Sequence, residues 1–538
     1  MLNVLLINLP IDGLSSHSDS SDFASRYIQP PSALMYLAGK LINEDCINEI
    51  QCLDYNAIDY SGISSKDEYC KAIVEKLSGV RYTQELKLIV CISITYSITY
   101  SFFELLVKRA KKMFPNSTIV CGGMHATSTV DVIFSNNPEV DYVVCGEGEE
   151  CLLELIKAIC LNRYENIMGV HTKSNIKRQG DGSFETAMLP HDISMNLEAY
   201  DVFDMELYTK VMPTSILQKS DVEKRYYSIL VSRGCPVQCT FCAARTVHGL
   251  NMRWRDVEDI RSEIMYVYNN FGVTWISMMD SIITPKSKAM EFLEMLSSTP
   301  KDISYSMGGT SVNHIDEEII DAMVKANFDY IYIPIETGSK EMQKKVKKNV
   351  NLDKAVKLIQ YAKSVGLKTW CYYMLGFPEE SLEQMQETID FAKKAKSDWA
   401  NFFVASPLPG TDMYNQFIEM GYIKNSPEYW NSYRAFDTKE ISASDLSSLA
   451  YKANLDYNFV QNRFISEGRY DEAEKLFLRF VKKYDFHIFG WDCLEQVYIA
   501  TDRYSDAHEA RKKIESLLNE NQTSQALNKY YNELKCRA

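Results

Sequence analysis

The chain has 538 residues, of which 46% are hydrophobic and 24% charged, a balance typical of globular domains rather than of disorder. A formal net charge of −14 argues against broad nucleic-acid binding, which needs a basic surface. No stretch approaches the ~20 consecutive apolar residues of a membrane span, and the first residues lack the basic segment of a signal peptide. These features predict a cytoplasmic protein that is neither secreted nor embedded in a membrane.

Short apolar runs alternate with helical patterns over the first 160 residues. The alternation predicts βαβ units and therefore a parallel sheet covered on both faces, in a doubly wound, Rossmann-like domain over 1–160. The expected strands are 4–9, 49–53, 88–95, 117–121 and 141–145, and the expected helices are 33–43, 67–77, 102–114, 128–134 and 149–160.

Sheets of this kind bind ligands beyond the carboxyl ends of their strands. The residues at four such ends are candidates for a ligand site: Pro10; Thr95 and Tyr96; Gly122, Gly123 and His125; Gly146, Glu147 and Gly148. The glycines let backbone approach a ligand closely, although tight turns are the alternative. No G-x-G-x-x-G string is formed, so dinucleotide binding is not predicted.

Residues 161–224 are weakly patterned and predict a linker. A second alternating region over 225–435 predicts a partial (β/α)6 barrel, short of the eight units of a full barrel. Its expected strands are 227–231, 274–278, 303–307, 330–335, 368–375 and 400–404, and its expected helices are 257–269, 286–297, 316–326, 352–365 and 382–395.

The chain from 436 to 538 is expected to be all helical. The strings Gly468–Ala473 and Asp502–Ala507 are similar, and their tyrosines, Tyr470 and Tyr504, lie 34 residues apart, the period of tetratricopeptide repeats. Two repeats are fewer than usually stand alone, so we expect this segment to dock on the barrel. A structural cap is favoured over a surface for protein contacts.

Three of the 14 cysteines are clustered, and the others are interpreted as small buried hydrophobes. Cys235, Cys239 and Cys242 have the spacing C-x3-C-x2-C directly after the first strand of the second region. A structural zinc site would need a fourth ligand, and His248 is the nearest candidate. Three thiolates on a [4Fe–4S] cluster would leave one iron open, which favours a reactive site.

At these residues the sequence resembles the radical S-adenosylmethionine enzymes, whose motif is C-x3-C-x-aromatic-C, with Phe241 as the aromatic. The resemblance implies that the open iron binds S-adenosylmethionine, which is cleaved to a 5′-deoxyadenosyl radical, and that Phe241 packs near the adenine. It further implies cofactor contacts at Asp280, Glu336 and Gly376, on segments similar to later barrel strands. The implied partners are a small-molecule substrate and an electron donor such as flavodoxin or ferredoxin.

The N-terminal region, by the same resemblance, is similar to the cobalamin-binding domain fused ahead of many radical enzymes. The strand-end residues named above would then contact cobalamin. An Asp-x-His-x-x-Gly string, which in some proteins supplies a histidine to cobalt, occurs at Asp485–Gly490. It lies in the helical tail and not after a strand, so we interpret it as chance and expect no histidine on cobalt.

The resemblance favours a cobalamin-dependent radical methyltransferase acting on an unactivated carbon of a small, natural-product-like molecule. A second hypothesis keeps the architecture but replaces methyl transfer with radical cyclisation, ring rearrangement or oxidation. A third makes the cluster a sensor or structural element of a binding protein.

Overall fold

The computed structural model describes residues 1–11, 29–57, 66–82, 85–163, 166–212, 215–220, 222–279, 285–430, 435–519 and 525–535. The chain forms two compact units. The first contains residues 1–210, 227–273 and 406–434, and the second contains 211–226, 274–405 and 435–538. Within the described ranges, no helix has the length and apolar character needed to cross a membrane.

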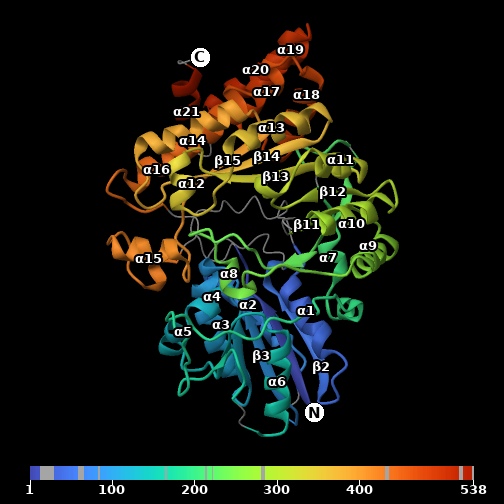
Figure 1. Cartoon of the computed structure of the whole chain (residues 1–538), viewed down its shortest axis with the longest axis vertical. Coiled ribbons are helices and arrows are strands. Elements are labelled where there is room, and N and C mark those ends of the chain that lie inside the picture. The colour runs from blue at the N-terminus through green and yellow to red at the C-terminus, as the bar shows by residue number, and fades with distance from the viewer. Residues whose placement is uncertain are drawn as a thin grey trace. The chain divides into compact units, whose positions relative to one another are not determined.

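The first unit is built on a six-stranded sheet in the order β2-β1-β3-β4-β5-β6. Figure 1 labels β2 and β3 of this sheet among helices of the same unit. Strands β1 to β5 pair in parallel and β6 is antiparallel to β5. Their bounds are β1 Leu2–Asn8, β2 Ile47–Asp54, β3 Lys87–Ser93, β4 Thr118–Gly122, β5 Tyr142–Val144 and β6 Val170–His171. The predicted doubly wound fold is confirmed, because strand order reverses between β1 and β3.

Helices join these strands near their predicted positions: α1 Ser32–Leu41, α2 Lys66–Ser78, α3 Tyr100–Met113, α4 Met124–Ser128, α5 Val130–Asn136 and α6 Glu149–Cys160. Strand β1 is deeply buried, since six of its seven residues are buried. A strand pressed between neighbours and covered on both faces reads as an unbroken apolar run.

The stretch expected to be a linker carries short elements. Besides β6 it contains the 3-10 helix η4 Leu197–Val202, α7 Met205–Tyr208 and β7 Val211–Met212. Tyr208 is buried and its hydroxyl donates to Asp54 Oδ2 over 2.8 Å, which ties this stretch to β2. The expectation of weak local structure therefore understated the packing of these residues.

The second unit contains a sheet with the order β15-β14-β13-β12-β11-β8-β7. The pairs from β11 to β15 are parallel, and β7 is antiparallel to β8. The bounds are β8 Lys224–Ile229, β11 Val273–Met278, β12 Ser304–Met307, β13 Phe328–Glu336, β14 Lys368–Leu375 and β15 Trp399–Val404. Six βα-type strands in an open sheet confirm the predicted partial barrel.

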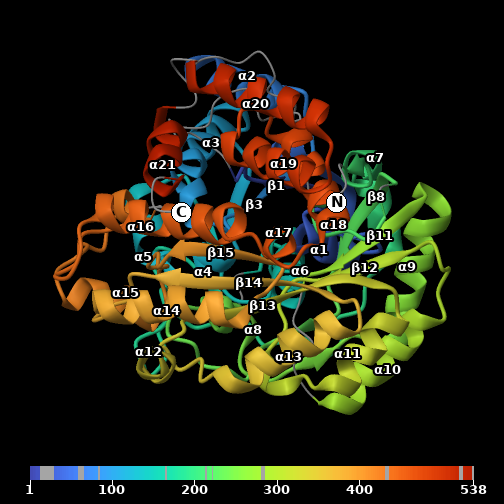
Figure 2. The same cartoon turned by 90° about the horizontal axis from the view of Figure 1, so that it is seen from above.

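Helices cover the outer side of this sheet, as Figure 2 shows for α10, α11, α13 and α14. Buried and half-buried residues alternate along β14, as expected when one face is covered by helices. The helices are α10 Lys286–Ser297, α11 Glu317–Lys325, α12 Lys340–Lys345, α13 Leu352–Ser364 and α14 Leu382–Ala395. Helix α15 Asp412–Glu419 then belongs to the first unit.

The C-terminal helices pack on the second sheet, as expected. They are α16 Ala443–Leu455, the π-helix η7 Asp456–Val460, α17 Arg463–Ser466, α18 Tyr470–Lys483, α19 Ile488–Ala500, α20 Tyr504–Asn519 and α21 Gln525–Lys535. The two similar strings begin α18 and α20. Trp275, Tyr330 and Trp399 of the sheet share one apolar cluster with Phe459 and Phe477 of the helices.

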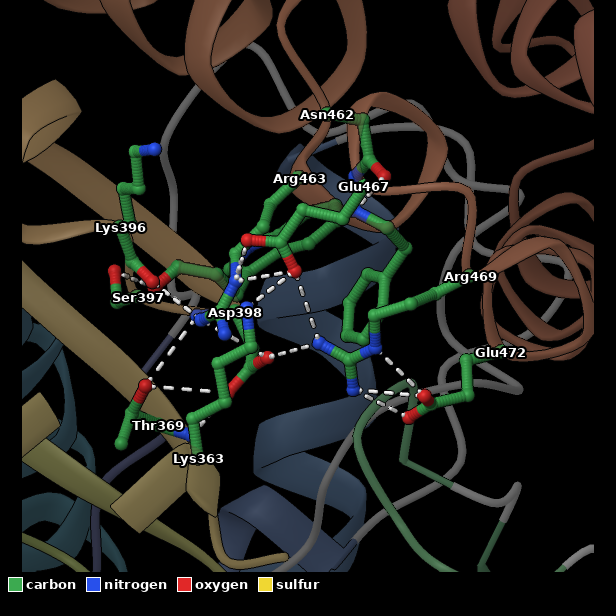
Figure 3. A network of polar contacts seen from close by, with 12 residues as sticks. Lys363, Thr369, Lys396, Ser397, Asp398, Asn462, Arg463, Glu467, Arg469 and Glu472 are labelled. Carbon is green, nitrogen blue, oxygen red and sulfur yellow. Dashed lines mark hydrogen bonds and ion pairs between the residues drawn. The ribbon is translucent and has the colours of Figure 1, made fainter. Parts of the chain in front are cut away.

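Polar contacts also fix this docking. Asn458 bridges the edge strand β15, because it accepts from Ala400 N over 3.0 Å and donates to Ala400 O over 2.7 Å. Asn454, one turn earlier, likewise accepts a hydrogen bond from Phe402 N over 3.0 Å and donates one to Phe402 O over 2.8 Å. Figure 3 shows a neighbouring network in which the buried carboxylate of Asp398 meets two arginines from the helical segment. A helix therefore covers the edge of the sheet, which otherwise would expose unpaired backbone groups.

Candidate functional site

The cysteine motif lies on a loop closed by a short two-stranded ribbon in the first unit. The ribbon pairs β9 Ser232–Arg233 with β10 Arg253–Trp254, and the short helix α8 Ala244–His248 lies between them. Gly234 has a φ of +87°, and a Cβ there would lie 2.1 Å from Asn251 O. Only glycine fits at this position, so the residue before Cys235 is set by a backbone crossing.

The loop folds back on itself around the three cysteines. Cys235 N donates to Gly249 O over 3.2 Å, and Cys242 N donates to Cys239 O over 3.3 Å. Cys239 is buried, whereas Cys235 and Cys242 are half-buried, and none of the three forms a disulfide. Phe241 is also half-buried.

The cysteines fit an iron–sulfur cluster better than a single metal ion. Among the described residues, no group of three or more His, Cys, Asp or Glu side chains is placed to hold one ion. A cubane cluster does not need such convergence, because each thiolate binds a different iron. Three thiols on one tight loop therefore suit a cluster, and among the described residues no fourth ligand is placed with them to complete a structural zinc site.

The buried cysteines of the N-terminal sheet differ from these three. Burial raises the pKa of the Cys91 thiol to about 12 and raises the pKa values of Cys121 and Cys145 as well. A thiol that stays protonated is neither a nucleophile nor a metal ligand. The interpretation of these cysteines as core residues agrees with their surroundings.

The predicted ligand loops of the first sheet meet at its carboxyl edge. Gly123 has a φ of +103°, and a Cβ there would lie 2.8 Å from Ile94 O, which accepts a hydrogen bond from His125 N over 3.0 Å. Thr127 Oγ1 accepts from Gly146 N over 3.0 Å, which joins the loops after β4 and β5. At Gly123 the close approach of the Ile94 carbonyl requires glycine whether or not a ligand binds there.

Other strand-end residues lie at the same edge with different exposure. Pro10 is buried beside Leu9, whose carbonyl accepts from Asn56 Nδ2 over 2.9 Å. Thr95 is half-buried and its hydroxyl lies 3.2 Å from Ser93 Oγ, whereas Tyr96 is 45% exposed. Gly122, at the end of β4, packs against Val144, and Gly148 immediately precedes α6.

His125 is enclosed by aromatic rings rather than exposed in a loop. Its Nδ1 lies 2.9 Å from Ser97 Oγ, and its ring packs against Trp430 at 4.5 Å and Tyr100 at 5.4 Å between centroids. Burial lowers its pKa to about 3, so the imidazole is neutral. Its Nε2 has no hydrogen-bond partner among the described residues.

Glu147 contacts the cysteine loop. Its carboxylate is bonded to Arg233, Arg253 and His248. Burial raises the pKa of Glu147, but the hydrogen bonds of His248 and Arg253 and the charge of Arg233 outweigh it and lower the pKa to about 2. Sequence reasoning assigned Glu147 to a cofactor and gave no sign of these partners, because they lie 86 to 106 residues away.

In the second unit, Glu336 ends β13 with strained backbone. It is a non-glycine residue with a φ of +69°, after a register shift between Pro334 and Glu336. Its carboxylate is 3.1 Å from Lys348 Nζ and is largely buried. Strain of this kind at a strand end is often retained at functional sites. Asp280, the other expected cofactor contact on a strand end, lies outside the described residues.

Gly376 follows β14 with a φ of +87°, and a Cβ there would lie 2.4 Å from Leu446 Cδ2. Its amide and that of Phe377 donate to Glu380 Oε2 over 2.6 and 3.0 Å. Burial raises the pKa of Glu380 to about 7 despite these bonds. Glu380 fixes this turn, and the sequence signal for it is its position at the end of the string Gly376-Phe377-Pro378-Glu379-Glu380.

The Asp485–Gly490 string lies in the helical segment of the second unit. His487 is half-buried and stacks on Phe459 with 4.7 Å between ring centroids, and the loss of solvent around its ring lowers its pKa to about 4. A Cβ at Gly490 would lie 2.8 Å from Val481 Cγ1, so this glycine allows α19 to approach α18. Helix packing accounts for both residues, which supports the interpretation of the string as chance.

Comparison with known protein families matches residues 25–156 to the B12 binding domain and residues 229–392 to the Radical SAM superfamily. The second match contains the cysteine loop. This chain belongs to the radical S-adenosylmethionine enzymes that carry a cobalamin-binding domain. Membership of these enzymes implies a [4Fe–4S] cluster, S-adenosylmethionine and cobalamin as cofactors.

Two relatives and one solved structure are similar to the chain over most of its length. It is 27% identical over 436 residues to an uncharacterised methyltransferase of Pyrococcus horikoshii, covering 80% of this chain and 87% of the relative. It is 26% identical over 477 residues to cytidylyl-2-hydroxyethylphosphonate methyltransferase of Streptomyces wedmorensis, with the same two coverages. The fold resembles the cobalamin-dependent S-adenosylmethionine radical enzyme OxsB with a TM-score of 0.63 at 12% identity, covering 100% of this chain and 84% of OxsB.

Proposed function

We propose that the chain is a cobalamin-dependent radical methyltransferase that methylates an unactivated carbon of a small, natural-product-like molecule. The observation that carries the proposal lies in the first unit, where the cysteine loop and the strand-end loops of the cobalamin-type sheet pack together. There Glu147 bonds to Arg233 over 2.8 Å, and His248 Nδ1 lies 2.7 Å from Glu147 Oε1. Methyl transfer needs reacting groups held close together, which such packing favours.

The proposed roles of the residues follow from their chemistry. Three irons of the cluster are held by Cys235, Cys239 and Cys242, and the fourth iron is left open. Phe241 packs near the adenine of S-adenosylmethionine. Glu336, held by Lys348, together with Asp280 and the turn at Gly376, orients S-adenosylmethionine. When bound, the cluster and S-adenosylmethionine supply the radical that removes hydrogen, and cobalamin supplies the methyl group.

The proposed cobalamin contacts are the strand-end residues of the first sheet: Pro10, Thr95, Tyr96, Gly122, Gly123, His125, Gly146 and Gly148. We propose that cobalt has no histidine ligand from this chain, because His487 is enclosed by the helical segment. We also propose the boundaries 1–160, 161–224, 225–435 and 436–538, a cytoplasmic location, and flavodoxin or ferredoxin as electron donor.

Anaerobic reconstitution with cobalamin, a reductant and methyl-labelled S-adenosylmethionine tests the proposal. The reconstituted protein is incubated with a fractionated pool of small molecules, and products are sought by mass spectrometry. A labelled methyl group on a new carbon–carbon bond supports methyl transfer. A product that is cyclised or oxidised without label supports the second hypothesis, and failure to cleave S-adenosylmethionine under reducing conditions supports a sensor or binding role.

A further inference from the structure

The carboxylate of Glu147 has all of its acceptor sites occupied by the protein itself. Oε2 accepts from Arg233 Nη1 over 2.8 Å and from Arg253 Nη1 over 2.9 Å. Oε1 accepts from Arg253 Nη2 and lies 2.7 Å from His248 Nδ1. A carboxylate offers about four acceptor positions, so these contacts saturate it. With its side chain 1% exposed, Glu147 has no position left with which to contact a cofactor.

The three residues bonded to Glu147 lie before and after the cysteines of the loop. Arg233 precedes Gly234 and Cys235 directly, in β9. His248 ends α8 and Arg253 lies in β10, both after Cys242. Glu147 itself follows β5 of the N-terminal sheet. One side chain therefore holds both stems of the loop on the carboxyl edge of that sheet.

The charges around this contact are balanced. Arg233 also meets Glu149 Oε1 over 2.6 Å, and its guanidinium lies 4.4 Å from the ring centre of Tyr36. Arg253 donates in addition to Pro190 O over 2.8 Å. Two guanidinium groups thus face two carboxylates at side-chain exposures of 1 to 13%. Removal of one partner from such a buried set leaves a charge without compensation.

We propose that Glu147 is a positioning residue that fixes the cluster loop to the N-terminal sheet and does not bind cobalamin or S-adenosylmethionine. The inference rests on the proposed function only in that the loop holds an iron–sulfur cluster. A loop whose two stems are pinned has fewer conformations, so its three thiolates stay arranged for the irons. A loop released from one stem loses iron more readily.

Replacement of Glu147 by glutamine removes the carboxylate without changing its size. The amide has one oxygen for four donors, and its NH2 group would face a guanidinium. We expect Glu147→Gln to lose iron to a chelator at least about tenfold faster than the wild type, because a buried charge pair is broken. Arg253→Lys keeps the positive charge but loses the bidentate guanidinium contact with Glu147, and we expect a smaller acceleration of iron loss, of about threefold or more.

The matched control is Asp398→Asn. Asp398 is likewise a buried carboxylate that faces two arginines, Arg463 and Arg469, and it belongs to the second unit. All variants are purified as full chains, reconstituted anaerobically, and compared by the decay of cluster absorbance under chelator, by thermal unfolding without cofactors and by cobalamin binding.

The proposal predicts comparable losses of thermal stability in Glu147→Gln and Asp398→Asn but faster iron loss only in Glu147→Gln, with cobalamin affinity within about threefold of wild type. Equal iron loss in the two variants would overturn it, as would a cobalamin affinity lowered tenfold in Glu147→Gln. If Glu147→Gln fails to fold, unchanged iron loss in Arg253→Lys overturns it. A wild-type chain that takes up no cluster would contradict the proposed function instead, so the two failures are distinguishable.

Discussion

Replacing Asn458 by alanine should loosen the edge of the barrel sheet. The side chain is buried and supplies both hydrogen bonds of Ala400, to the amide over 3.0 Å and to the carbonyl over 2.7 Å. A buried donor or acceptor left unsatisfied costs ~1–3 kcal/mol. The loss of both partners in Asn458→Ala therefore predicts a decrease of about 2–6 kcal/mol in the local stability of β15.

Hydrogen exchange of the Ala400 amide measures this decrease without assuming that the whole chain unfolds in one step. Since ~1.4 kcal/mol is a factor of ten, exchange should accelerate at least about 30-fold in Asn458→Ala. Gln461→Ala, which removes an exposed side chain bonded to Asp456, is the control and should leave the rate nearly unchanged. An acceleration below about fivefold in Asn458→Ala would refute the reasoning that this side chain secures the strand.

Three further substitutions test other parts of the structure. Gly123→Ala should destabilise the chain by more than ~1 kcal/mol in thermal unfolding, because Gly123 has a positive φ and the added Cβ would lie 2.8 Å from Ile94 O. Gly180→Ala is the control: its Cβ would meet nothing within 4 Å, so thermal stability should not fall. In the folded chain the pKa of Glu380 is raised to about 7, so its contribution to stability is present below pH ~4.5 and is lost as pH rises through 7. The stability of Glu380→Gln should depend less on pH in this window and should exceed that of the wild type by up to ~3 kcal/mol near pH 8. An unchanged pH profile of stability would contradict this. His487→Ala should lower thermal stability but leave cobalamin affinity and the paramagnetic resonance of cobalt(II) as in the wild type, and a lost nitrogen signal would show that the string binds cobalt.

Most elements of the fold could be predicted because their periodicity is local. Strand β14 and helices α10 and α14 have the bounds expected from sequence, and α14 begins with a capping box of Ser381 and Gln384. Strand β6 was missed, since two residues carry no periodic signal and its pairing with β5 is set by tertiary contacts.

The site was predictable only where its residues are close in sequence. The cysteine motif could be read because three ligands lie within eight residues of one another, from Cys235 to Cys242. The contact of Glu147 with Arg253 joins residues 106 positions apart, and no local pattern encodes such a pair. The glycine at 123 could be read as special, but whether a ligand or the Ile94 carbonyl requires it depends on packing.

The central claim is that the cysteine loop and the N-terminal sheet serve one radical reaction with two cofactors. The most direct measurement follows methyl-labelled S-adenosylmethionine in the reconstituted, reduced protein, with 5′-deoxyadenosine and labelled methylcobalamin as the two products. The wild type should form both, and Cys239→Ala should form no 5′-deoxyadenosine, since its thiolate anchors the cluster. Undiminished 5′-deoxyadenosine in Cys239→Ala, or its absence from a wild type that carries a full cluster, would contradict the account.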